Sequence, residues 1–175
     1  AVHMPNGLIE GNVISNVCYP GLLVATTVRW GRWTMGHAPS NVIIRGHVLA
    51  QVNRALQPPA DSFVAMGVEP QGKEYEITRA PVLRNIIYES NVIRGSGWQA
   101  AVFGACRDVL VKDNWFIDAN RPPSKPGYGG AMMVKNAEGM LILGNRAENP
   151  SGPGKDQGLV IEGKSTKDIL VGVNP

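Results

Sequence analysis

One short pattern of apolar and polar positions occurs six times along the chain. Each copy begins with a small or amide residue, the anchor, followed by three mostly apolar residues, two variable residues and a terminal residue. The terminal residue is Asn in five copies and His47 in the other. The copies cover residues 6–12, 41–47, 85–91, 108–114, 139–145 and 168–174. Short β-branched runs bounded by Gly, Asn, Asp and Pro predict a β-strand in every copy.

A second short strand is expected between successive copies, after Gly21, Ser62, Gln99, Gly130 and Gly158. The anchors are 35, 44, 23, 31 and 29 residues apart, so the repeat length varies while its core does not. Helical solenoids keep a stricter period and show apolar spacing of 3.6 residues over longer stretches. Two or three strands per repeat, always in the same order, therefore predict parallel sheets that stack coil on coil.

The recurring terminal residue has a physical role in such a stack. An amide side chain is both donor and acceptor, so amides about 4.8 Å apart can form a hydrogen-bonded column inside a turn. We expect Asn12, Asn91, Asn114 and Asn145 to form this column, with His47 in register as a substitute rung. The pattern resembles the asparagine ladders of the pectate-lyase-like superfamily. The resemblance implies an all-β fold, a right-handed parallel β-helix of about five to six coils.

The apolar pattern also assigns the two faces of the anchor strands, because side chains alternate along a strand. Positions one and three after each anchor, and position eight beyond the turn, should point into the core. Position four alternates in charge from Glu10 to Lys112, which predicts ion pairs between neighbouring coils. Position two should face outward, yet it is aliphatic in all six copies. We expect the stripe of Ile43, Ile87, Leu110 and Leu141 to be covered by a second copy, a missing domain or a folded-back loop.

Composition narrows the function classes only a little. The 175 residues carry a formal net charge of +3 and are 43% hydrophobic, which is ordinary for one folded domain. No apolar run approaches the ~20 residues that span a bilayer and no basic run exists, so neither a membrane nor a nucleic acid is the expected partner. The histidines show no metal-ligand spacing, and no cofactor is expected. Cys18 and Cys106 are expected as buried free thiols and not as a disulfide.

Candidate chemistry gathers in two long insertions just before the second and third anchors, at residues 29–40 and 69–84. Insertions at the same corner of adjacent coils should lie side by side. The aromatic residues there can stack on sugar rings, the arginines can hold carboxylates, and His or Glu can move protons. The alternative is that the tryptophans anchor the loop and the charges are solvated. The candidate substrate-binding residues are Trp30, Arg32, Trp33, Tyr75 and Arg84, and the candidate catalytic residues are His37, Glu74 and Arg79.

The stretch from Arg79 to Arg84, with Pro81 between them, is similar to the R-x-P-x-x-R motif of pectate lyases. The resemblance implies that Arg79 is the base that removes the proton beside a uronate carboxylate and that Arg84 binds substrate. The W-I-D-H-like segment, the acidic calcium cluster and the aspartate pairs of polygalacturonases are not found, so a chance match remains an alternative.

Three functions follow as hypotheses. The first is a polysaccharide lyase or glycoside hydrolase that acts on a polysaccharide, possibly an acidic one, in an extracellular or periplasmic location. The second is a non-catalytic scaffold or a tailspike-like or adhesin-like glycan-binding module. The third, nucleic-acid binding, has little support. The chain starts and stops within a repeat, so residues 1–175 are expected to be one β-helix domain of a longer protein.

Overall fold

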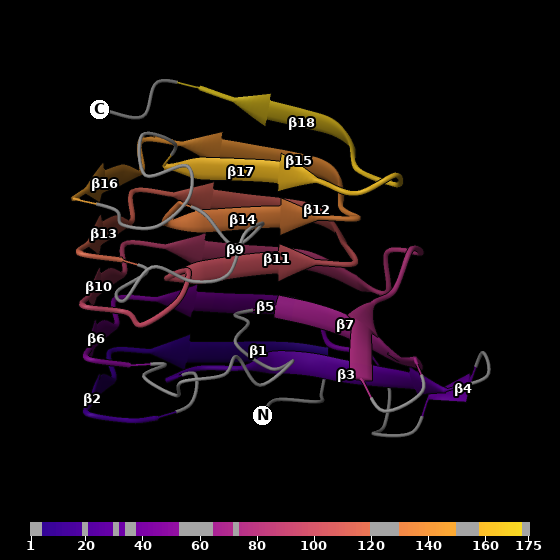
Figure 1. Cartoon of the computed structure of the whole chain (residues 1–175), viewed down its shortest axis with the longest axis horizontal. Helices are drawn as coiled ribbons and strands as arrows, with labels where there is room; N and C mark the ends of the chain where they lie inside the picture. The colour runs from indigo at the N-terminus through magenta and orange to yellow at the C-terminus, as the bar shows by residue number, and fades with distance from the viewer. Residues whose placement is uncertain are drawn as a thin grey trace.

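The computed structural model describes residues 5–18, 21–29, 32–33, 38–52, 65–71, 74–119, 130–149 and 158–172. These residues form β-strands, turns and bends, and no helix occurs among them, so none that could span a membrane is present in this part of the chain. The strands recur as triplets along the chain, and each triplet gives one strand to each of three sheets (Figure 1). The described residues are therefore an all-β parallel solenoid, as the repeats predict.

The first sheet holds the anchor strands, stacked in chain order and all parallel. It consists of β1 (Pro5–Glu10), β5 (Ser40–Arg45), β9 (Leu83–Glu89), β12 (Cys106–Lys112), β15 (Glu138–Leu143) and β18 (Lys167–Val171). The second sheet consists of β2 (Val13–Ser15), β6 (Val48–Ala50), β10 (Val92–Arg94), β13 (Trp115–Ile117) and β16 (Arg146–Glu148). Equivalent residues of successive copies pair in register, for example Leu110 with both Ile87 and Leu141.

The third sheet contains the second strand expected in each repeat. It consists of β3 (Val24–Arg29), β7 (Ala65–Gln71), β11 (Ala101–Gly104), β14 (Met132–Lys135) and β17 (Leu159–Glu162), extended by β4 (Arg32–Trp33) and β8 (Glu74–Ile77). All strand pairs are parallel except β3 with β4 and β7 with β8. These two antiparallel hairpins lie in the insertions that were predicted only as loops.

Left-handed backbone explains why the anchors are small or amide residues. Asn6, Asn41, Asn85 and Asp108 have φ between 54° and 60°, a region that Asn, Asp and Gly tolerate best. The residue five positions after each anchor, and the residue ten positions after it, adopt the same conformation in the first five copies. The anchors therefore bend the first-sheet strands one or two residues after they begin, and the positions five and ten residues later lie in the turns that follow the strands of the first and second sheets.

The core lies inside the coil, and its residues are those that the alternation predicts. Positions one and three are fully buried in the middle copies, at Val42, Ile44, Ile86, Tyr88, Val109, Val111, Met140 and Ile142. Position eight is buried at Leu49, Ile93 and Phe116. In the last copy Ile169 is half-buried and Val171 is exposed, because no described strand stacks beyond β18. The assignment of the faces is confirmed.

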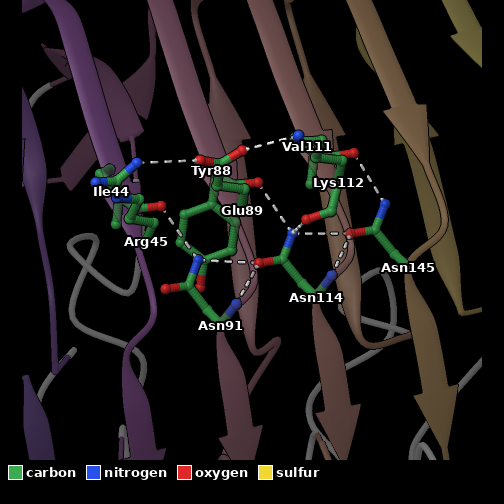
Figure 2. A network of polar contacts seen from close by, with 9 residues as sticks. All are labelled: Ile44, Arg45, Tyr88, Glu89, Asn91, Val111, Lys112, Asn114 and Asn145. Atoms are coloured by element: carbon green, nitrogen blue, oxygen red, sulfur yellow. Dashed lines mark hydrogen bonds and ion pairs between the residues drawn. The ribbon is translucent and has the colours of Figure 1, made fainter. Parts of the chain in front are cut away.

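The asparagine ladder is confirmed as well (Figure 2). Asn91 Nδ2 donates to Asn114 Oδ1 at 2.9 Å, and Asn114 Nδ2 donates to Asn145 Oδ1 at 2.8 Å. The same oxygens accept the backbone N–H groups of Asn91 and Asn114. Asn91 and Asn114 thus each donate twice to the next coil, once from the side chain and once from the backbone.

His47 occupies a rung of this ladder, as predicted. Its Nδ1 accepts the backbone N–H of Asn12 at 3.0 Å, so the ring proton lies on Nε2, which donates to Ile9 O at 3.1 Å. Its backbone N–H donates to Asn91 Oδ1 at 3.0 Å. Asn12 is exposed at the end of the column, and Asn174 lies outside the described residues.

Both cysteines are free, but only Cys106 is buried. The expectation of a buried thiol is wrong for Cys18, which is exposed in the bend after β2. Cys18 lies in the connection between β2 and β3 of the first coil, and no described coil stacks before this one.

Candidate functional site

The two insertions begin as β-hairpins on neighbouring strands. Strand β3 pairs with β7 in parallel from Val24 opposite Ala65 to Thr27 opposite Val68. Beyond this stretch β3 folds back into β4 and β7 folds back into β8. In Figure 1, β4 lies past the ends of the stacked strands, on the side where both hairpins leave the coil. The strands that carry the insertions are thus neighbours, while the prediction that the insertions themselves lie side by side includes residues outside the described ranges.

The hairpins place four of the predicted site residues on two separate strands that extend the third sheet. Arg32 and Trp33 form β4, while Glu74 and Tyr75 begin β8, opposite Gln71 and Pro70 of β7. Strands β3 and β7 stand between these two pairs. The positions of the four side chains are outside the described part of the structure, as are Trp30 and His37 altogether. Their roles remain predictions.

The segment that connects β8 to β9 is fixed by hydrogen bonds at the corner between the third and first sheets. Asn136 Nδ2 donates to the carbonyl oxygens of Ile77 and Thr78, both at 3.2 Å. Thr78 is buried, and its hydroxyl donates to Ala80 O at 2.7 Å. The backbone N–H of Val82 then joins the next coil at Ala105 O, at 2.7 Å. These bonds fix the bend in which Arg79 lies.

Arginines cluster where this connection enters the first sheet. Arg79 is exposed in the bend, and Arg84 is exposed on β9 immediately before an anchor. Arg84 pairs in register with Arg107 of β12, which is exposed too. Neighbouring strands are about 4.8 Å apart, so the two arginine side chains leave the sheet from adjacent positions along the stack. We call Arg79, Arg84 and Arg107 the arginine rim.

The charge at this rim is poorly compensated within the described residues. Arg107 Nε is 3.9 Å from Asp108 Oδ2, the limit of an ion pair, and no ion pair of Arg84 occurs among them. In the same row, one and two strands further on, Glu138 and Lys167 neutralise each other at 3.1 Å. The row before the anchors therefore begins with two adjacent positive residues, Arg84 and Arg107, and continues with the paired charges of Glu138 and Lys167.

Arg107 was missed from the sequence. It precedes its anchor directly, as Arg84 does, so counting one position back from each anchor would have found the pair. A second feature, an exposed column of amides at the anchors themselves, was also missed. Asn85 Nδ2 donates to Asn41 Oδ1 and Asn41 Nδ2 to Asn6 Oδ1, both at 2.8 Å.

The groups with perturbed pKa values lie away from the rim, in the core. Burial raises the pKa of the Cys106 thiol to about 12 and raises the pKa of the Tyr88 hydroxyl well above its usual range. Both groups therefore stay protonated, and neither faces solvent. Within the described ranges no cluster of His, Cys, Asp or Glu could hold a metal ion.

No protein-family model, curated protein or solved structure matches the chain.

Proposed function

We propose that the protein binds an acidic polysaccharide at the arginine rim. The observation that carries the proposal is the pair Arg84 and Arg107, two exposed and poorly compensated guanidinium groups on adjacent parallel strands. Each guanidinium can hold a carboxylate with two parallel hydrogen bonds. A polymer of uronate residues that runs along the stack presents its carboxylates repeatedly, so it can use both arginines at once.

The hairpins would complete such a site. In the proposal Trp30, Trp33 and Tyr75 supply faces on which sugar rings stack, and Arg32 binds a further acidic group. The similarity to pectate lyases around Arg79 and Pro81 supports a lyase or a hydrolase, a finer assignment that is also a proposal. His37, Glu74 or Arg79 would then move the proton, and the protein would work in an extracellular or periplasmic space.

The second candidate is a non-catalytic scaffold or a tailspike-like or adhesin-like glycan-binding module. The aliphatic stripe on the first sheet, half-buried along its middle and exposed at Leu8 and Leu170, favours it, since a stalk that packs against other chains needs an apolar face. The glycan-binding form of the second candidate would use the same arginine rim, whereas a scaffold alone would bind no glycan. The glycan-binding form differs from the first candidate only in that no bond is cleaved.

Binding is tested with polygalacturonate and alginate, beside neutral glycans of similar length. We expect Arg84→Gln and Arg107→Gln each to weaken polyuronate binding about tenfold, because each removes charge-assisted hydrogen bonds. The control is Lys167→Gln, in the same row of the sheet but neutralised by Glu138, which should change the affinity less than twofold. Circular dichroism shows whether each variant is folded.

The proposal fails if the folded protein does not bind polyuronates, or if both arginine variants bind as well as the Lys167→Gln control. Unsaturated uronate ends, detected by absorbance, would indicate a lyase, and new reducing ends without them a hydrolase. Binding without either product would favour the non-catalytic module.

A further inference from the structure

The outer face of the first sheet carries two parallel columns that run from coil to coil. The aliphatic column contains Leu8, Ile43, Ile87, Leu110, Leu141 and Leu170. Its ends are strongly exposed, with 58% of Leu8 and 65% of Leu170 open to solvent, and the four residues between them are half-buried. The charge column lies two residues further along each strand and contains Glu10, Arg45, Glu89 and Lys112. A long aliphatic stripe beside ordered charges is typical of a protein interface.

The charges of this column are paired within the chain. Arg45 Nε lies 2.8 Å from Glu10 Oε1, Arg45 Nη1 lies 4.0 Å from Glu89 Oε1, and Lys112 Nζ lies 3.1 Å from Glu89 Oε2. The sign therefore alternates strictly over four coils. If a column of four alternating charges is turned end for end and placed against an identical column, every charge faces a charge of opposite sign.

We propose that two copies of the chain pack face to face through this sheet, around a two-fold axis parallel to the strands and between β5 and β9. This operation reverses the order of the coils but keeps the columns aligned. Glu10 then faces Lys112 of the second copy, and Arg45 faces Glu89 of the second copy. The aliphatic columns also meet, with Ile43 against Ile87 of the second copy, and two such sheets pack about 10 Å apart.

The same charges select this register over its neighbours. If the axis lies on β5, Arg45 faces the Arg45 of the second copy and Glu10 faces the Glu89 of the second copy, so like charges oppose each other. An axis on β9 brings Arg45 against Lys112. With the axis between β9 and β12, Glu89 faces Lys112 but Glu10 and Arg45 face uncharged residues, and in the row before the anchors Arg84 lies against Arg107. Like-charge contacts disfavour each of these registers.

The interface is small, so the dimer is expected to be weak. Four overlapping coils of about five residues each cover about 19 Å by 17 Å, well below the roughly 800 Å² per partner of a standard interface. We expect a dissociation constant on the order of 10–100 µM, measured by sedimentation equilibrium at loadings from about 1 to 500 µM.

Charge reversal gives the decisive test. Arg45→Glu should weaken the dimer at least tenfold, because both symmetry-related pairs with Glu89 become repulsive. The double variant Arg45→Glu/Glu89→Arg should restore the dissociation constant to within about threefold, because the pairs across the axis are again opposite in sign. Within one chain the same double variant sets Glu10 beside a new glutamate and Lys112 beside a new arginine. A purely intrachain role therefore predicts no rescue.

Lys135→Glu on the third sheet is the matched control, since it breaks an exposed ion pair of 3.1 Å with Glu162 on another face. It should leave association unchanged, whereas Ile87→Glu should abolish it. A wild type that is monomeric at all loadings, a trimer, or a double variant no better than Arg45→Glu would overturn the proposal. These outcomes leave the binding test of Arg84 and Arg107 unaffected, so the two proposals fail separately.

Discussion

Asparagine serves this chain in two ways that depend on different properties of one side chain. At Asn91, Asn114 and Asn145 the amide is buried, and its donor and acceptor join successive coils. At anchors such as Asn41 and Asn85 the decisive property is tolerance of positive φ, and the amide column that results is exposed. The internal column should therefore carry more of the stability than the external one.

Asn91→Ala should lower the free energy of unfolding by about 1–3 kcal/mol. The change removes the acceptor of the His47 N–H and the donor to Ile44 O, and both groups are left buried without that partner. Urea denaturation measures the loss. Asn12→Ala, at the exposed end of the same column, is the control and should cost less than about 0.5 kcal/mol. Equal effects at the two positions would show that burial of the ladder does not stabilise the fold.

At the scale of elements, the sequence predicts the strands better than the insertions. The anchor strands are predicted because each repeats the same inward and outward positions, and neighbours such as Val109 and Ile86 must then stack in register. The insertions have no repeat, so the pairing of β7 with β8 was not foreseen. The rim was found only in part. Arg84 was predicted from a local motif, but its neighbour Arg107 is 23 residues away and becomes a neighbour only through the register of the coils.

The hairpin of β7 and β8 depends on a glycine in the next coil. A Cβ on Gly104 would lie 2.9 Å from both Cδ1 and Cγ2 of Ile77, closer than packed atoms can approach. Gly104→Ala should therefore displace the end of β8 and destabilise the protein by about 1–3 kcal/mol. The measurements are urea denaturation and hydrogen exchange of the β8 amides.

The matched variant Ile77→Ala removes both opposing atoms. The double variant Gly104→Ala/Ile77→Ala should be less destabilised than the sum of the single variants, with a coupling of about 0.5–3 kcal/mol. Strict additivity would mean that the two residues do not pack against each other.

At the scale of the whole molecule, the coil encloses a single apolar interior in which two groups can ionise only at a cost. Tyr88 and Cys106 come from adjacent strands of the first sheet, and Tyr88 packs edge-on against Phe103 with ring centroids 5.6 Å apart. The Tyr88 hydroxyl has no hydrogen-bond partner among the described residues. Folding therefore holds both groups in their neutral form, and stability depends on the pH at which the unfolded chain releases those protons.

The free energy of unfolding should fall as the pH rises above about 9, the ordinary pKa of a cysteine thiol. Between pH 9 and 12 the unfolded chain loses the Cys106 proton while the folded chain keeps it, so alkali favours unfolding by up to about 1.4 kcal/mol per pH unit. Tyr88 adds a similar slope above about pH 10, because burial raises its pKa as well.

Urea denaturation of the wild type and of Tyr88→Phe at pH 7.5, 9, 10 and 10.5 measures the contribution of Tyr88 to this loss of stability. Tyr88→Phe should match or exceed the wild type at pH 7.5, since it removes an unpaired buried hydroxyl, and its advantage should grow above pH 10. Exposed lysines and other tyrosines titrate equally in both proteins, so the difference between the two curves isolates Tyr88. A difference that stays constant from pH 7.5 to 10.5 would show that water reaches this hydroxyl and that the interior of the coil is not dry at Tyr88.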